Sequence, residues 1–163
     1  MVVDAVPRLR GLADTAYLTA LQQLARRELS EAQLRQRLLR RGFSHDDIDA
    51  AVVRLRQDGS LDDARVAGAI ARSQLSLKKR GHLRVRREIE AAGIASALAE
   101  RAVAEVYADV DVDALLAAAI DRRLGTGRIE DDRDMARVFR YLIGQGFESD
   151  RAMAALRARR KRG

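Results

Sequence analysis

The sequence predicts an all-α protein built as a tandem array of three three-helix modules, elongated and curved. A Gly followed by a large apolar residue recurs at Gly42, Gly93 and Gly146, with spacings of 51 and 53 residues. Ala, Arg and Leu dominate the 163 residues, which contain a single Pro, and this composition favours helix. No segment shows sustained alternation of apolar and polar residues, so we expect no sheet.

Each recurring Gly stands between two amphipathic stretches, where it would end a helix in the left-handed conformation. The apolar residue after it should contact a residue in the last turn of that helix. The predicted pairs are Phe43 with Leu38, Ile94 with Ile89, and Phe147 with Leu142. A repeat of roughly 50 residues is typical of stacked helical modules. We therefore predict modules at residues 14–58, 61–108 and 111–160.

In the first module, we expect a loose lead-in over Met1 to Ala13 and a helix from about Asp14 to Arg27. The apolar stripe predicted for that helix consists of Leu18, Leu21, Leu24 and Ala25. Residues 30–33, Ser-Glu-Ala-Gln, have the form of a capping box that starts the second helix, which Gly42 ends. The third helix begins after Ser44 and stops at residues 58–60, with its apolar face made by Ile48, Ala51, Val52 and Leu55.

The second module repeats this plan. Leu61-Asp62-Asp63 leads into its first helix, and the basic segment 77–82 connects to a second helix that Gly93 ends. Ser96 is expected to cap the third helix. The inward residues of that helix stand 6, 9, 10 and 13 positions after Gly93, as they do after Gly42: Ala99, Ala102, Val103 and Val106.

The third module starts near Asp111, contains a loop at residues 124–127, and resumes with a helix near Asp132 that Gly146 ends. Its last helix has apolar residues at offsets 6, 9 and 10 from Gly146, but Arg159 stands at offset 13. The acidic pairs at 46–47, 62–63 and 131–132 each precede or open a helix, where carboxylates cap free N–H groups.

Composition argues against several classes of function. Cys is absent, and the two His residues have no ligand spacing, so we expect no metal and no cofactor. No nucleophile elbow or phosphate loop is present, and we expect no enzymatic activity. No apolar run could span a bilayer, so we expect a cytoplasmic monomer without membrane contact. The net charge of +7 instead suggests an anionic partner.

The densest basic segment, residues 78–87, holds six cations and no acidic residue. A second group lies at the C-terminal end of the second helix, and a third closes the chain. Cations near a helix C-terminus also interact with the helix dipole, so solvation and capping explain part of these groups. The candidate binding residues are Arg35, Arg37, Arg40, Arg41, Lys78, Lys79, Arg80, Arg84, Arg86, Arg87, Arg157, Arg159 and Arg160.

The basic segments contain no interleaved aromatic residues, which argues against base stacking. Any contacts to nucleic acid would therefore be made mostly to phosphate, with weak sequence preference and strong dependence on salt.

The order of motifs resembles the bacterial RecX family, regulators of the RecA recombinase. The resemblance covers about Ala16 to Leu156 and rests on residues 17–30, Gly42-Phe43, residues 61–67 and residues 86–94. The Leu-Asp-Asp junction followed by Arg65 and the basic turn containing Gly81 are its most specific parts. The first two modules match best.

The resemblance implies an array of three-helix modules that performs no chemistry. It also implies binding in the groove of the RecA–single-stranded DNA filament and inhibition of strand exchange and ATPase activity. Two alternatives remain open at this point: a helix-turn-helix-like DNA-binding regulator, which would bind duplex sequence-specifically, and a structural adaptor, whose binding would be indifferent to salt.

Overall fold

In this computed structural model, which describes residues 6–162, the regular structure is helical and the described residues contain no strand. No helix in this range is both long and apolar enough to cross a membrane. The helices are α1 (Val6–Leu24), α2 (Glu31–Arg40), α3 (His45–Gln57), α4 (Asp63–Ser76), α5 (His82–Ala91), α6 (Ser96–Tyr107), α7 (Val112–Leu124), α8 (Asp132–Gln145) and α9 (Ser149–Arg162).

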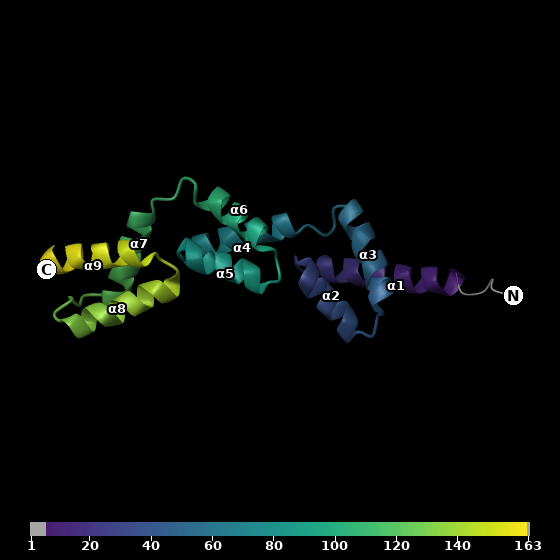
Figure 1. Ribbon diagram of the computed structural model, residues 1–163, viewed down its shortest axis with the longest axis horizontal. Coiled ribbons are helices and arrows are strands. Elements are labelled where there is room, and N and C mark those ends of the chain that lie inside the picture. Colours follow the sequence, from purple (N-terminus) through teal and green to yellow (C-terminus); the bar gives the residue numbers. More distant parts are fainter. Residues whose placement is uncertain (1–5, 163) are drawn as a thin grey trace.

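The helices gather in threes, and each group encloses its own apolar core. The extensive helix–helix contacts lie inside these groups. They join α1, α2 and α3 to one another, and likewise α4, α5 and α6, and α7, α8 and α9. Figure 1 shows the three groups following one another along the long axis of an elongated molecule. The all-α, three-helix architecture predicted from the sequence is therefore confirmed, and the residue boundaries of the modules remain our proposal.

The three predicted glycine helix ends are confirmed. Gly42, Gly93 and Gly146 have φ of 88°, 80° and 94°, in the left-handed region. Phe43 N–H donates to the Leu38 carbonyl over 3.3 Å, and Phe147 N–H donates to that of Leu142 over 3.2 Å. These are two of the residue pairs that the repeat predicted, and Ile94 and Ile89 are buried in one core.

The offsets counted from each Gly also predicted the buried face of the helix that follows. Ile48, Ala51, Val52 and Leu55 are buried in α3, and Ala99, Ala102 and Val103 are buried in α6. Ala152 and Leu156 are buried in α9, where Arg159 is exposed as expected. The predicted capping box at Ser30 is present, and Asp62 and Asp131 cap α4 and α8.

The limits and the apolar stripe predicted for α1 were partly wrong. The helix ends at Leu24 rather than Arg27, and Ala25, predicted in the stripe, lies beyond that end and is exposed. The helix begins at Val6 rather than Asp14, because Pro7 falls in the first turn, where its missing N–H costs nothing. The predicted lead-in is thus helical from Val6, and Met1 to Ala5 lie outside the described residues. Leu18 is 57% exposed, whereas Ala16 and Ala20 are buried. The helix therefore turns its small residues toward α3, against which it packs.

Leu61 belongs to the first core rather than to the second module. Its side chain is buried with Leu29 and Leu55, and its N–H donates to the Leu55 carbonyl over 3.0 Å. Leu61 thus packs with the first module, although the sequence analysis counted it as the first residue of the second.

Modules two and three join where the end of α8 meets the start of α5. Gly81 N–H donates to the Gln145 carbonyl over 2.9 Å, and Leu83 N–H donates to the Gly146 carbonyl over 3.1 Å. These N–H and C=O groups belong to helix ends, which leave such groups without partners inside their own helix. A Cβ on Gly81 would lie 2.3 Å from the Gly146 oxygen, so the contact requires Gly at both positions.

Modules one and two join in the same manner. The end of α5 meets the start of α2, where the buried Ser30 hydroxyl donates to the Ala92 carbonyl. A Cβ on Gly93 would lie 2.4 Å from that of Ala32. Ser30 and Gly81 each stand 12 residues before the Gly of their own module, so the two junctions are equivalent in the repeat. Helices α8, α5 and α2 thus dock end to end.

We expect Gly81→Ala to open the junction between modules two and three while all three modules stay folded. Gly81 has φ of −73°, which Ala adopts without strain, so the effect comes only from the new Cβ against the Gly146 backbone. Hydrogen exchange at the Leu83 amide should accelerate, while amides in the cores of α5 and α8 keep their protection.

Gly144→Ala is the matched control, because a Cβ there meets nothing within 4 Å. Because Gly144 lies in the last turn of α8, this change should be neutral or stabilising by at most roughly 0.5–1 kcal/mol. Slow exchange at Leu83 in Gly81→Ala would contradict the junction as described.

Candidate interaction surface

The densest basic segment forms the turn between α4 and α5, and we call residues 77–81 the basic turn. Lys79 N–H donates to the Leu75 carbonyl over 3.1 Å, and Arg80 N–H donates to that of Gln74 over 3.2 Å. These bonds close α4 and require a left-handed residue. Lys79 fills that role with φ of 52° and is the one non-Gly residue with positive φ in the described chain.

Two neighbours hold the basic turn in place. The Tyr107 hydroxyl of α6 donates to the Arg80 carbonyl over 2.6 Å. Burial raises the pKa of this phenol to about 12, so it remains a donor at neutral pH. On the other side, the Gly81 N–H bond to α8 ties the turn to the third module. The turn is therefore fixed between two modules.

Four of the six cations in this segment face no carboxylate. Lys78, Lys79 and Arg87 are exposed and Arg80 is half-buried, and none forms an ion pair with any side chain that the structure describes. Leu77, beside the two lysines, is 79% exposed. Together these residues present unneutralised charge on a rigid backbone.

Arg84 and Arg86 instead make contacts inside the chain. Arg84 Nη1 donates to the Gly144 carbonyl over 2.8 Å and so bridges the junction with the third module. Arg86 bonds Glu90 and Glu100 at 3.0 and 2.9 Å. The Ser96 hydroxyl donates to Glu90 and, with Arg86, holds the pKa of that carboxyl below its ordinary value. Ser96 is thus not the predicted cap of α6.

The ion pair by which Arg86 of α5 holds Glu100 of α6, which we call a brace, has a counterpart in the first module. Arg35 pairs with Asp49, as Arg86 pairs with Glu100, and both pairs join the second helix of a module to the third. Each Arg stands seven residues before the module Gly and each carboxylate seven residues after it. In the third module the same positions hold Phe139 and Met153. This complementarity was the signal in the sequence that marks Arg35 and Arg86 as braces.

The other candidate residues divide in the same way. Arg37, Arg40, Arg41 and Arg157 have no ion pair with any described side chain. Arg159 lies 2.7 Å from Asp121, and Arg160 lies 2.6 Å from Asp132. The structure therefore places the candidates in separate groups, one on each module. Sequence analysis overlooked Arg140, which is exposed and stands six residues before Gly146, as Arg87 does before Gly93.

Replacing Lys79 with Gly should strengthen the end of α4. A non-Gly residue in the left-handed region carries a steric cost that exceeds the entropy cost of Gly, so we expect a gain of roughly 0.5–1 kcal/mol. Hydrogen exchange at the Lys79 and Arg80 amide positions reports this local free energy. Lys78→Gly is the control and should weaken the turn, since Lys78 has no positive φ. Equal effects in the two variants would contradict the strained geometry.

The basic turn should lose stability at alkaline pH. Below pH 10, the ordinary pKa of tyrosine, the Tyr107 phenol is protonated in both folded and unfolded chains. Between about 10 and 12 the unfolded chain releases the proton that the folded chain retains, so stability falls as pH rises. Subtracting the phenolate absorbance of the Tyr107→Phe variant from that of the native chain leaves the titration of Tyr107. Its midpoint should lie near pH 12. A midpoint near 10 would contradict the buried phenol.

Comparison with known proteins agrees with this architecture. The family model described as RecX, first three-helix domain, matches residues 16–55. The regulatory protein RecX of Halorhodospira halophila is 33% identical over 141 residues, covering 85% of this chain and 84% of that protein. The regulatory protein RecX of Acidithiobacillus ferrooxidans is 35% identical over 147 residues, covering 88% and 89%.

Solved structures share the fold. The crystal structure of RecX from Lactobacillus salivarius has a TM-score of 0.74 at 18% identity and covers 91% of this chain and 97% of its own. A second crystal structure of a regulatory protein RecX has a TM-score of 0.77 at 20% identity, covering 94% and 75%. From its curated relatives, this chain belongs to the RecX family of regulatory proteins.

Proposed function

We propose that this protein inhibits the RecA recombinase by binding in the groove of the RecA–single-stranded DNA filament. Membership of the RecX family supports a regulatory role, and the RecA partner follows from what that family implies. The observation that carries the binding site is the basic turn, whose cations lack carboxylate partners among the described side chains. In this proposal the protein acts by occupying contact surfaces and performs no chemistry.

The charge of the basic turn, together with that of Arg87 in α5, suits an anionic filament. Lys78, Lys79 and Arg87 are exposed, so their association with phosphates or carboxylates does not first require breaking an internal ion pair. Contacts to DNA phosphates release counterions, which makes such binding strongly salt-dependent. The turn contains no aromatic residue for base stacking, so the contacts carry little sequence preference.

The shape of the molecule suits a repetitive partner. The modules extend along one axis (Figure 1). Each module also carries cations without described ion partners. Several weak contacts made by one rigid chain raise the overall affinity, because each contact after the first is intramolecular. A single bound monomer could thereby engage more than one subunit of a filament and suppress both strand exchange and ATPase activity.

The double variant Lys78→Glu with Arg87→Glu should lose filament binding by tenfold or more and lose inhibition of the RecA ATPase in parallel. Co-sedimentation with RecA–single-stranded DNA filaments across a salt series measures the affinity, and its salt dependence should become weaker in the variant. Arg84 is left intact, because its contact with Gly144 holds the junction.

Arg101→Glu with Arg122→Glu is the matched control, because it changes the net charge equally at exposed residues outside the basic segment 78–87. Unchanged inhibition by the Lys78/Arg87 variant, or an equal loss in the control, would refute the assigned surface. The assay includes DNA without RecA and duplex DNA. Sequence-specific duplex binding would favour the helix-turn-helix regulator instead.

A further inference from the structure

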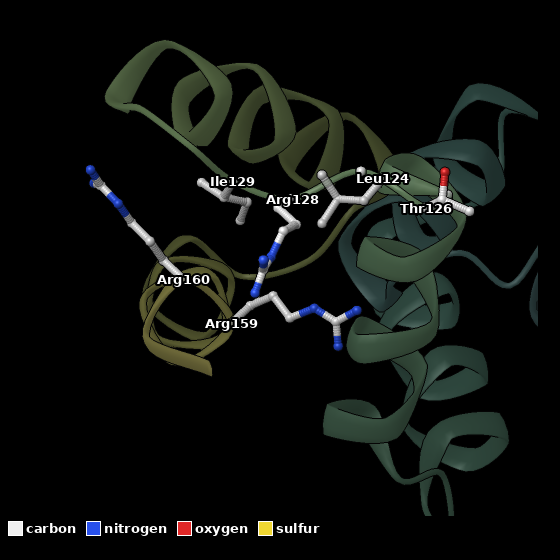
Figure 2. A pocket seen from close by; sticks show the side chains of 8 residues that line it. Leu124, Thr126, Arg128, Ile129, Arg159 and Arg160 are labelled. Atoms are coloured by element: carbon white, nitrogen blue, oxygen red, sulfur yellow. The ribbon is translucent and has the colours of Figure 1, made fainter. Parts of the chain in front are cut away.

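A hollow of about 370 Å3 lies in the third module, between the α7–α8 loop and the last turns of α9. Its lining contains three charged residues, and all three are arginines: Arg128, Arg159 and Arg160. Figure 2 shows Arg128 reaching from the loop toward α9, where Arg159 and Arg160 leave the helix in different directions. The remaining lining is the glycine-rich loop from Leu124 to Gly127, together with Ile129.

The three guanidinium groups differ in their engagement. Arg159 uses Nη2 to contact Asp121 at 2.7 Å, and Arg160 uses Nη1 to contact Asp132 at 2.6 Å. Both pairs are largely exposed, and exposed ion pairs are weak. Each guanidinium keeps further N–H donors for another acceptor. Arg128 has no ion pair with any side chain in the described part of the chain.

The loop backbone adds donors to this arrangement. Gly125 N–H donates to the Asp121 carbonyl over 2.8 Å, and Gly127 N–H donates to the Leu124 carbonyl over 2.9 Å. These two hydrogen bonds fix the turn. The buried Ile129 side chain anchors its far end in the module core. The amides of Thr126 and Arg128, between these anchors, donate no hydrogen bond to any described residue.

We propose that this hollow is a binding site for one phosphate group. A guanidinium fork matches two oxygens of a phosphate, and backbone N–H groups in a fixed loop complete such sites. The hollow is open enough to admit a phosphodiester with the groups on either side. The phosphate site itself does not depend on the proposed function. Only its assignment to the single-stranded DNA of the filament rests on that function.

The experiment titrates the isolated full chain, labelled with 15N, with short oligothymidylate and separately with inorganic phosphate. The site predicts saturable shifts of the Thr126 and Arg128 amide resonances with oligothymidylate. Arg128→Gln should weaken that interaction about tenfold, the effect of losing one charge-assisted hydrogen bond. Arg122→Gln removes an equal charge from an exposed residue of the same module that does not line the hollow, and should leave it unchanged.

Absence of shifts at the loop, or equal weakening in the two variants, would overturn the proposal in favour of general electrostatic attraction. If the loop amides shift with inorganic phosphate but not with oligothymidylate, the hollow binds phosphate, and DNA is excluded as the molecule that supplies it. RecA is absent from this titration, so its outcome is independent of filament inhibition. Loop shifts without inhibition would leave the site intact and refute only the proposed function.

Discussion

The architecture depends on helix ends that meet and satisfy one another. At the second junction, the last carbonyls of α8 accept the first N–H groups of α5, and at the first junction the Ser30 hydroxyl donates to the Ala92 carbonyl at the end of α5. Each of these backbone groups would otherwise lack a partner in its helix, and a buried group left unpaired costs about 1–3 kcal/mol. The aligned dipoles of helices docked in this sense also attract. A row of three helices therefore connects the modules with little apolar contact between them.

This manner of docking determines which cations remain available. Arg84 bridges the junction, and Arg35 and Arg86 brace the second helix of a module against the third. Their charges are thus used to build the array. Lys78 and Lys79 lie in the turn that the junction and Tyr107 hold fixed, yet they contact no described carboxylate. The same contacts that order the backbone of the basic turn leave its charges facing solvent.

Local features of the fold could be predicted from the sequence, and features that depend on contacts between modules could not. The glycine helix ends and the buried offsets after them follow from helix geometry within about 15 residues. The role of Gly81 could not be predicted, because its neighbour is Gly146, 65 residues away. The engagement of Arg86 depends on Glu100 in another helix, although the matching position of Asp49 could have indicated it. The hollow beside Arg128 exists only because α9 returns to the α7–α8 loop.

The central claim is that a rigid end-to-end array presents its unpaired cations to a nucleoprotein filament. Electron cryomicroscopy of RecA–single-stranded DNA filaments with this protein bound tests that claim most directly. The account predicts elongated density along the filament groove, with all three modules in the order of Figure 1 and the turn at Lys78–Arg80 against the filament. Density outside the groove, or with that turn facing solvent, would contradict it.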